Sequence, residues 1–371
     1  MILQLLFDDP FADYAIKQFA PYRDLVRFVM VRWGASCEIK HVKLIEHVDI
    51  IDYFSPAYKE LCSQLGSYSA VIMHSLCSPW QWEIVRLLPV HVKLAWVVFG
   101  TEVYDRHDME WRNLSRSSKF LLSLRHLKGV LFKESKSSET PLDVLQRVDY
   151  CLNSSIEIFE EIKGYIGNES MQHIRYSYFT IEDMVGNLLD ERASGDNVLL
   201  GNCANITNNH ITALNIMRKT KFSRNASLIV PLSYGSAWTK KIICRYAKIF
   251  FRDKFTPLMN YLPRDEYNCI FLSCSTFVDA HYRPNAFGNI LTSLWIGLHV
   301  YVSKYAIQTT FLKNLGLRFG ILEEDLRNDG NDYVRASDED FQHNREILMA
   351  NYGKNQIEKN VDNIIRVLGQ R

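Results

Sequence analysis

One stretch constrains the fold of this chain more than any other, because it places a helix pattern between two strand patterns. Residues 268–274 and 299–303 are short apolar runs that favour buried strands. Between them, a polar loop with Arg283-Pro284-Asn285 precedes a helix pattern. The apolar face of that helix contains Ile290, Leu291, Leu294, Trp295 and Leu298. A strand, a helix and a strand in this order predict two parallel strands of one sheet joined by a helix.

The loop before this helix is a candidate binding site. Ligands of open parallel sheets bind beyond the carboxyl ends of the strands, and a helix N-terminus favours a phosphate or diphosphate. Gly288 would let the backbone come close to such a ligand, and Arg283 or Asn285 would add side-chain donors. An ordinary connection, in which the small residue only permits tight packing, explains the same pattern. Both interpretations stay open from this loop alone.

Strand and helix patterns alternate through most of the 371 residues, a length that suggests two domains. The alternation is interrupted by a polar segment without periodicity at residues 189–196 and then starts again. We therefore predict an α/β fold with two parallel-sheet domains, at residues 1–185 and 186–340. Residues 341–371 are predicted to form C-terminal helices that could pack back on the first domain.

Charge and cysteine content narrow the class of protein. The chain has 43 Lys and Arg against 42 Asp and Glu, so no overall field attracts nucleic acid, and we expect no nucleic-acid partner. The basic runs at residues 218–221 and 240–241 are too short for that role; they are either solvated or able to dock on an anionic membrane. Eight scattered cysteines without a CxxC pair favour a reduced, cytoplasmic compartment.

A second strand-end loop is rich in small polar side chains. It follows the apolar run at residues 197–200 and contains Gly201, Asn202, Asn205 and Asn208. Such a loop can donate several hydrogen bonds to a phosphorylated ligand, although Asn and Thr are also ordinary helix caps. In a third loop, Tyr234 could stack on a base or a sugar, or could simply pack.

The corresponding edge of the first domain contains two titratable candidates. His74 ends the apolar run at residues 70–74, and Glu102 follows the strand pattern at residues 93–99. Either could serve as a general base or stabilise a developing charge. Alternatively, His74 caps the next helix and Glu102 is solvated.

Several common motifs are absent from the sequence. There is no GxGxxG after the first strand, no Walker A sequence, no HExxH and no GxSxG. Two short acidic runs, at residues 264–266 and 338–340, are more typical of a solvated surface than of a metal site. We therefore expect neither a dinucleotide nor a metal ion as cofactor.

Taken together, the strand-end motifs resemble those of the bacterial 4-acetamido-4,6-dideoxygalactose (Fuc4NAc) transferases, glycosyltransferase family 56. The resemblance extends over about residues 70–315. Its motifs are His74 with Pro79-Trp80, Trp96 to Tyr104, Val198 to Asn202 with Asn208 and His210, Val230-Pro231 with Tyr234, and Arg283 with Ala286-Phe287-Gly288. One departure is Glu102, which stands where the family has Asp.

This resemblance implies the GT-B fold, two Rossmann-like domains facing across a cleft. It implies transfer of Fuc4NAc or a related deoxysugar from a dTDP-sugar to a polyprenyl-diphosphate-linked oligosaccharide, without a metal. The second domain would bind the donor, and the first would bind the acceptor through Trp80, Thr101 and Tyr104, with His74 or Glu102 as base. The expected donor-binding residues are Gly201, Asn202, Asn205, Asn208, Tyr234, Arg283, Asn285, Phe287, Gly288 and Asn289.

A lipid-linked acceptor implies a cytoplasmic protein that is peripheral at the inner face of the bacterial cytoplasmic membrane. The sequence has no run of about 18 uncharged apolar residues, so we expect contact through amphipathic segments near residues 11–22 or 115–128. Two other functions are compatible with the same scaffold. One is a nonenzymatic protein that binds a nucleotide or sugar, and the other is a GT-B-like epimerase that needs no lipid acceptor.

Overall fold

The computed structural model describes residues 1–34, 36–127, 139–220, 225–328 and 333–370. The chain forms two compact units. Unit 1 contains Met1–Arg106, Ser135–Thr180 and Lys354–Arg371, and unit 2 contains His107–Glu134 and Ile181–Gly353. The sequence-based ranges differ from these units in three ways: residues 107–134 and residues 181–185 belong to unit 2, and only the last of the C-terminal helices belongs to unit 1.

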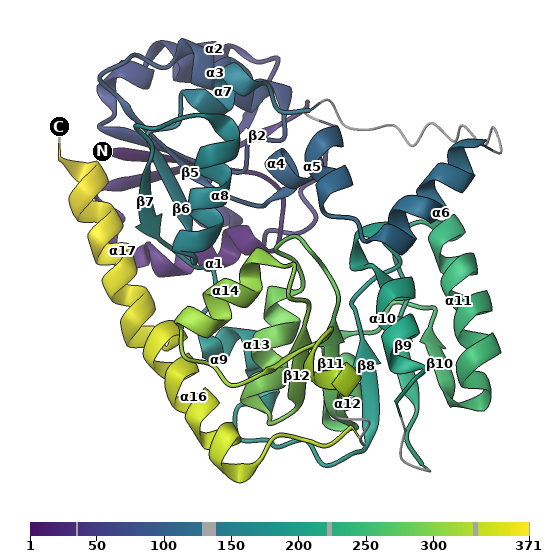
Figure 1. Ribbon diagram of the computed structural model, residues 1–371. Coiled ribbons are helices and arrows are strands. Elements are labelled where there is room, and N and C mark those ends of the chain that lie inside the picture. Colours follow the sequence, from purple (N-terminus) through teal and green to yellow (C-terminus); the bar gives the residue numbers. More distant parts are fainter. Residues whose placement is uncertain (35, 128–138, 221–224, 329–332, 371) are drawn as a thin grey trace. The chain divides into compact units, whose positions relative to one another are not determined.

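Unit 1 is built on a seven-stranded, wholly parallel sheet in the order β3-β2-β1-β4-β5-β6-β7 (Figure 1). The strands are β1 (Ile2–Leu6), β2 (Val26–Arg32), β3 (Asp49–Asp52), β4 (Ala70–His74), β5 (Lys93–Val97), β6 (Tyr150–Asn153) and β7 (Gln172–Arg175). Because the central strands are covered on both faces, they are buried along their whole length and mainly apolar rather than alternating. All carboxyl ends therefore meet at one edge, where His74 pairs with Val97.

The helices of unit 1 are α1 (Phe11–Gln18), α2 (Pro56–Ser63), α3 (Pro79–Leu87), α4 (Thr101–Tyr104), α7 (Leu142–Gln146), α8 (Ile156–Ile166) and α17 (Lys354–Gly369). Three of them, α2, α3 and α8, begin after a capping serine. The helix start predicted at Ser78-Pro79 is confirmed: Ser78 and Gln81 form a capping box, and Pro79 occupies the first turn.

The last helix of the chain, α17, belongs to the core of unit 1. It contacts β7, and Val361, Ile364 and Leu368 lie on its buried face within the same apolar cluster as β1 and β2. Their spacing of three and four residues follows the helical period, which explains why one stripe is buried while Lys359 and Asp362 remain exposed.

Unit 2 is built on a six-stranded parallel sheet in the order β10-β9-β8-β11-β12-β13. The strands are β8 (Asn197–Leu200), β9 (Leu228–Pro231), β10 (Phe255–Leu258), β11 (Cys274–Asp279), β12 (His299–Val302) and β13 (Gly320–Ile321). The helices are α5 (His107–Arg112), α6 (Arg116–Leu127), α9 (Ile181–Val185), α10 (His210–Met217), α11 (Ala237–Phe251), α12 (Arg264–Leu272), α13 (Phe287–Trp295), α14 (Ile307–Asn314), α15 (Asp325–Asn328) and α16 (Asp338–Tyr352).

The sheet of unit 2 has a separate core on each face. Leu199 faces one apolar cluster, whereas its neighbours Val198 and Leu200 face the other. This period of two is the expected geometry of a strand, and both sets of side chains are buried because helices cover both faces. The prediction of parallel strands in a doubly covered sheet is therefore confirmed for both units.

The strand predicted at residues 268–274 is wrong. These residues lie mainly in α12, and the strand starts only at Cys274. Pro263 before the segment and Asp265 and Glu266 in its first turn are helix-start signals that outweigh a short apolar run. The real strand, β11, was hidden because its polar Ser275, Thr276 and Asp279 are buried and hydrogen-bonded.

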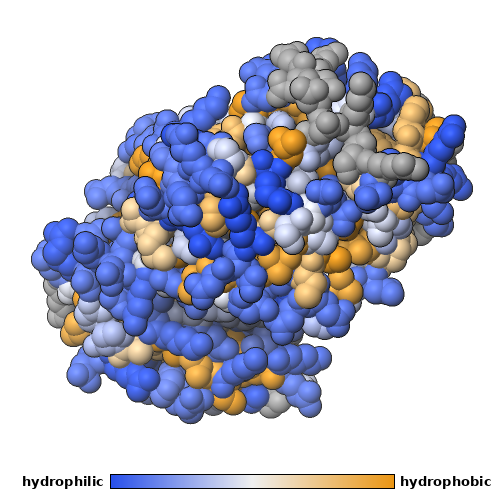
Figure 2. Space-filling view, turned by 90° about the horizontal axis from the view of Figure 1, so that it is seen from below, coloured by the Kyte–Doolittle hydropathy of each residue, from blue (hydrophilic) through white to orange (hydrophobic). Residues whose placement is uncertain are grey.

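The face of the molecule in Figure 2 shows no extended apolar patch. On the face shown in Figure 2, hydrophilic side chains predominate and apolar side chains gather in small separate groups. In the part of the chain that the structure describes, no helix has the length and apolar character needed to cross a membrane. Lys128 and Lys221, at the ends of two segments singled out in the sequence, lie outside the described residues.

The packing of α17 predicts the effect of one core substitution. Ile364 is fully buried, so Ile364→Ala should lower the free energy of unfolding of unit 1 by about 2–5 kcal/mol, from lost burial and the cavity left behind. Urea unfolding followed by tryptophan fluorescence measures this loss. The exposed Lys359 on the same helix provides the control, since Lys359→Ala should change stability by less than about 0.5 kcal/mol. Equal stability of the two variants would show that α17 does not pack as described.

Candidate functional site

The loop after β8 has a fixed backbone shape. Gly201 has φ +67°, and a Cβ atom there would lie 2.8 Å from Asn208 Oδ1 and 2.9 Å from His210 Nε2, so only glycine fits. The Asn208 side chain accepts a hydrogen bond from the Asn202 backbone N–H at 3.2 Å. Asn205 caps the following turn by accepting from the Thr207 N–H at 3.2 Å. The capping role is therefore confirmed for Asn205, while ligand binding by this loop stays a prediction.

Three buried polar groups around this loop have no hydrogen-bond partner among the described residues. They are Asn202 Oδ1, Thr207 Oγ1 and both ring nitrogens of His210, which is only 3% exposed. Native proteins satisfy nearly all buried polar groups, so such a cluster indicates a polar ligand. Burial lowers the pKa of His210 to about 3, so the ring is neutral at pH 7 and offers one donor and one acceptor.

His210 was noted in the sequence only as part of a motif and not as a site residue. The signal that could have identified it is its position. It is the first residue of α10, directly after a strand-end loop, in a helix whose other buried residues are apolar.

The loop after β11 rests on a buried polar network. Asp279, at the end of the strand, accepts from His281 Nδ1 at 2.5 Å and from Gln308 Nε2 at 2.6 Å, and all three side chains are inaccessible to solvent. Asn285 contacts His281 Nε2 at 3.1 Å and donates its backbone N–H to Gln308 Oε1 at 3.1 Å. The network holds the predicted Arg283–Asn289 loop in one conformation, and sequence reasoning did not find it.

The helix that follows, α13, begins without a side-chain cap. Its N-cap residue, Ala286, has φ +53° and donates its own N–H to Asn285 Oδ1 at 2.9 Å, but no side chain among the described residues caps the first turn. A Cβ atom on Gly288 would meet nothing within 4 Å, so space is open beside this turn. Free N–H groups and open space at a helix N-terminus are the features that favour an anion.

Two predicted donor residues on α13 have partners inside the protein. Phe287 packs its ring against Phe311 and Tyr352, with centroids 5.6 and 6.0 Å apart. Asn289 donates from Nδ2 to Tyr267 Oη at 3.3 Å. Both residues therefore support the loop in this structure.

The three predicted loops of unit 2 lie together. Gly201 donates its backbone N–H to Val278 O at 2.9 Å, and Ala204 donates to Tyr234 O at 2.8 Å. Burial raises the pKa of the Cys203 thiol, and the nearby charge of Arg283 partly opposes this rise. Tyr234 is more than half exposed. The carboxyl edge of this sheet thus gathers the uncapped helix, Arg283, Tyr234 and the cluster around His210.

The two candidate bases of unit 1 are both buried. His74 contacts Tyr178 Oη at 2.7 Å through Nδ1 and Gln4 Oε1 at 2.8 Å through Nε2, and burial lowers its pKa to about 3. Both ring nitrogens are therefore occupied, and His74 would have to break one contact to accept a proton.

Glu102, unlike His74, has one side-chain atom that could accept a proton without breaking a hydrogen bond. Its Oε1 accepts hydrogen bonds from the Leu76 N–H at 3.1 Å and from Trp96 Nε1 at 3.2 Å, while Oε2 has no partner among the described residues. Burial raises the pKa of this carboxyl group, and its hydrogen bonds oppose the rise. The expectation that Glu102 might simply be solvated is wrong, because the side chain is 2% exposed.

The predicted acceptor residues differ in accessibility. Trp80 is 4% exposed and Tyr104 1%, and Tyr104 Oη donates to Glu161 Oε2 at 2.6 Å. Thr101 is exposed, with Oγ1 3.1 Å from Cys77 Sγ. Of these three residues, Thr101 alone could touch a large ligand in this conformation. Among the described residues, no cluster of three or more His, Cys, Asp or Glu could hold a metal ion.

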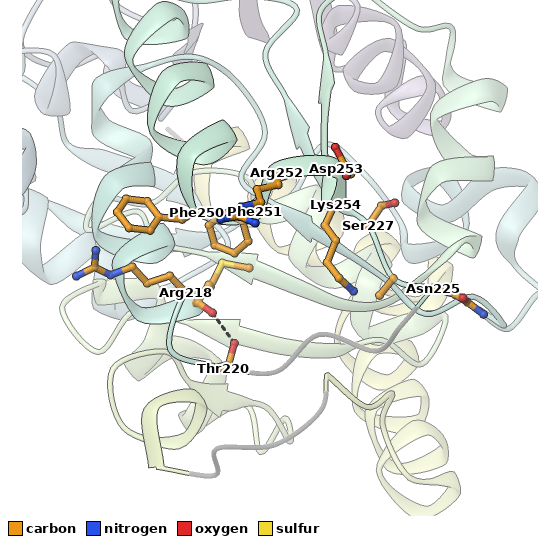
Figure 3. A pocket seen from close by; sticks show the side chains of 11 residues that line it. Arg218, Thr220, Asn225, Ser227, Phe250, Phe251, Arg252, Asp253 and Lys254 are labelled. Carbon is orange, nitrogen blue, oxygen red and sulfur yellow. Dashed lines mark hydrogen bonds between the residues drawn. The ribbon is translucent and has the colours of Figure 1, made fainter.

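A hollow of about 650 Å³ lies elsewhere in unit 2, where α10 and α11 end and β9 and β10 begin (Figure 3). Arg218, Arg252 and Lys254 line it together with Asp253. Figure 3 shows Arg218 beside Phe250 on one side and Lys254 toward Asn225 on the other. Cations at helix C-termini offset the helix dipole, which accounts for these residues without a ligand. The hollow is at the amino edge of the sheet and is separate from the strand-end loops.

Comparison with known proteins identifies the fold. No family model matches the sequence, and neither does any curated protein. Solved structures do match over the whole chain, and together with the two Rossmann-like units they define the GT-B fold of glycosyltransferases.

Three of these structures illustrate the similarity. A glycosyltransferase from Rickettsia africae has a TM-score of 0.63 and 12% identity, with 100% of this chain and 98% of that chain covered. HepE from Anabaena, in complex with UDP and glucose, has a TM-score of 0.59 and 10% identity, with 99% of each chain covered. The lipopolysaccharide outer core galactosyltransferase WaaB has a TM-score of 0.60 and 9% identity, again with 99% of each chain covered.

The burial of His210 predicts a pH dependence of stability. An unfolded histidine titrates near pH 6.5, whereas His210 titrates at about 3 in the folded protein. Between these values the unfolded chain binds a proton that the folded chain does not, so stability is complete above about pH 6.5 and falls as the pH drops. Each such histidine contributes a slope of about 1.4 kcal/mol per pH unit.

We therefore expect His210→Gln to reduce this slope by one proton equivalent between pH 6 and 4.5, measured by urea unfolding of unit 2. If the variant kept the wild-type slope, His210 would have to be protonated in the folded protein.

Proposed function

We propose that this protein is a glycosyltransferase that takes its sugar from a nucleoside diphosphate sugar bound by unit 2. The observation that carries the proposal is the meeting of an uncapped helix N-terminus, Arg283 and the unpartnered His210 at one edge of the sheet. GT-B neighbours that are described with UDP, such as HepE, support the same ligand class.

The donor diphosphate would be stabilised by neutral and cationic groups of the chain. The free N–H groups at the start of α13 and the positive end of its dipole would offset the charge that develops on the leaving diphosphate. Arg283 would add a charge-assisted hydrogen bond, and His210 with Asn202 would bind further polar atoms of the donor. We propose that these groups allow transfer without a metal ion.

For the sugar and its acceptor, we propose the substrates that the sequence motifs imply. The donor would be dTDP-Fuc4NAc or a related dTDP-deoxysugar, and the acceptor a polyprenyl-diphosphate-linked oligosaccharide at the inner face of the cytoplasmic membrane. WaaB, a lipopolysaccharide galactosyltransferase by its description, supports a role in surface polysaccharide synthesis. Thr101 is the acceptor-binding candidate with an accessible side chain.

Glu102 is the better candidate for the base that deprotonates the acceptor hydroxyl. Its Oε2 has no partner among the described residues, and a carboxyl group whose pKa is raised by burial accepts a proton more readily near neutral pH. His74 is the second candidate, and its two occupied nitrogens argue for a positioning role.

The burial of both candidate bases favours one alternative, a nonenzymatic nucleotide- or sugar-binding protein. Such a protein would bind the nucleotide in unit 2 without turnover. An epimerase would convert the nucleotide sugar without any acceptor, so product analysis with and without acceptor separates all three functions.

The donor class is tested by thermal unfolding in the presence of dTDP, UDP, GDP, CDP or ADP, each with and without EDTA. A ligand that binds the folded state stabilises it by about 2.7 kcal/mol at 100 times its dissociation constant. We expect dTDP to raise the melting temperature whether or not EDTA is present, and Arg283→Ala to reduce this shift by weakening binding at least about tenfold. A shift with another nucleotide alone would replace dTDP as donor. An unchanged shift in Arg283→Ala would overturn the site.

A glycine substitution tests the position of the diphosphate. Gly288→Ala adds a methyl group that meets no protein atom within 4 Å, and Ala is a better helix former than Gly, so stability should be kept or slightly increased. If the diphosphate approaches this turn, the same methyl group should weaken dTDP binding about tenfold in calorimetric titration. Gly164→Ala, in the helix α8 and also without a neighbour within 4 Å, is the matched control and should bind normally. Normal binding by both variants would place the diphosphate elsewhere.

A further inference from the structure

Two helices of unit 2, α6 and α11, lie side by side (Figure 1). Both pack against α10, and the guanidinium group of Arg125 on α6 lies 5.4 Å from the ring centroid of Trp238 on α11. Leu121 of α6 and Ile242 of α11 line the same narrow groove. The inner faces of both helices are thus turned to the body of unit 2, and their outer faces are turned to solvent.

The charges on these two helices all have one sign. Together α6 and α11 contain seven Lys and Arg residues and no Asp or Glu. The whole chain is almost neutral, with 43 basic and 42 acidic residues, so this local excess is a property of the surface and not of the composition. The outer face of α17 differs, because its basic residues alternate with Glu358 and Asp362.

Large apolar side chains stand among these cations. Phe120 on α6 is 63% exposed, and Ile249 on α11 is 66% exposed, with Leu124 also exposed. They recur with the helical period among basic residues: Arg116, Phe120 and Leu124 follow one another at intervals of four, as do Lys241, Arg245 and Ile249. The α6–α11 surface consists of the exposed Arg116, Phe120, Leu124, Lys241, Arg245, Lys248 and Ile249 together with the half-buried Lys119.

We propose that the α6–α11 surface binds an anionic lipid bilayer, with its cations at the phosphate groups and Phe120, Leu124 and Ile249 entering the headgroup boundary. Outward apolar side chains between cations match this environment, in which both the charges and the apolar groups find partners. A nucleic acid would bind the cations but would gain little from Ile249 and Leu124, so a bilayer is favoured.

The other segment considered from the sequence, residues 11–22, is less suited to this role. In α1 the apolar Ala12, Ala15 and Ile16 are buried in the core of unit 1 and are therefore occupied. The α6–α11 surface would bring the protein to the membrane that its proposed acceptor occupies, and in this respect its role rests on the proposed function.

Flotation with lipid vesicles tests the surface on the full-length protein. We expect the protein to float with phosphatidylglycerol-containing vesicles but not with pure phosphatidylcholine, and to be released by 1 M salt, which screens charges beyond about 3 Å. Each basic residue near an anionic surface raises partitioning by roughly fivefold. The variant K241E/R245E/K248E should therefore lose at least about 100-fold in partitioning, and F120S/I249S at least about tenfold.

A matched control distinguishes an effect of this surface on flotation from an effect of the net charge of the protein. K354E/K359E/R366E reverses three exposed cations on α17, changes the net charge by the same amount, and should float like the wild type. Binding of dTDP, measured in parallel by thermal shift, should be equal in all variants, so loss of flotation is distinguishable from failure of the proposed donor site. Absence of flotation, equal loss in the two triple variants, or preferential binding of double-stranded DNA through α11 would overturn the proposal.

Discussion

Parallel pairing of every strand is the constraint on which the rest of this molecule depends. Parallel strands are joined by crossovers that cover both faces, so the strands are buried and mainly apolar, and accessible polar residues gather where strands end. Because all carboxyl ends of one sheet share an edge, loops far apart in sequence become neighbours. Gly201 and Arg283 lie 82 positions apart, yet β8 and β11 are adjacent and bring their loops together.

At this edge of the unit 2 sheet, one group of buried polar side chains is fully hydrogen-bonded and a neighbouring group is not. Asp279, His281 and Gln308 satisfy one another in a closed network with no access to solvent, which fixes the loop that they support. One strand away, the ring nitrogens of His210 and the Oδ1 atom of Asn202 are buried without partners among the described residues. A hydrogen-bonded network beside buried polar atoms without partners is typical of a preorganised binding site, because these atoms are already desolvated and oriented when a ligand arrives.

Sequence patterns predicted the parallel sheets, the start of α3, the two final helices and the loops that meet in unit 2, because each has a strong local signal. They failed where tertiary context decides. The apolar run at residues 268–274 fits a strand or a helix equally well, and the buried Ser275 and Asp279 disguised β11. The sequence patterns also could not predict which site candidates are accessible to solvent. Tyr104 and His74 lie in strand-end motifs that are typical of a site, yet both are buried by contacts from distant residues.

The assignment of α17 to unit 1 has a consequence for how the protein is made. The core of unit 1 includes Val361, Ile364 and Leu368, which are synthesised after all of unit 2. The apolar surface of the unit 1 sheet that α17 covers therefore stays exposed until all of unit 2 has been synthesised. Unit 2 starts and ends within the chain, at His107 and Gly353, and can complete its own core earlier. Unit 1 is therefore completed only after unit 2 has been synthesised, when α17 packs onto its core.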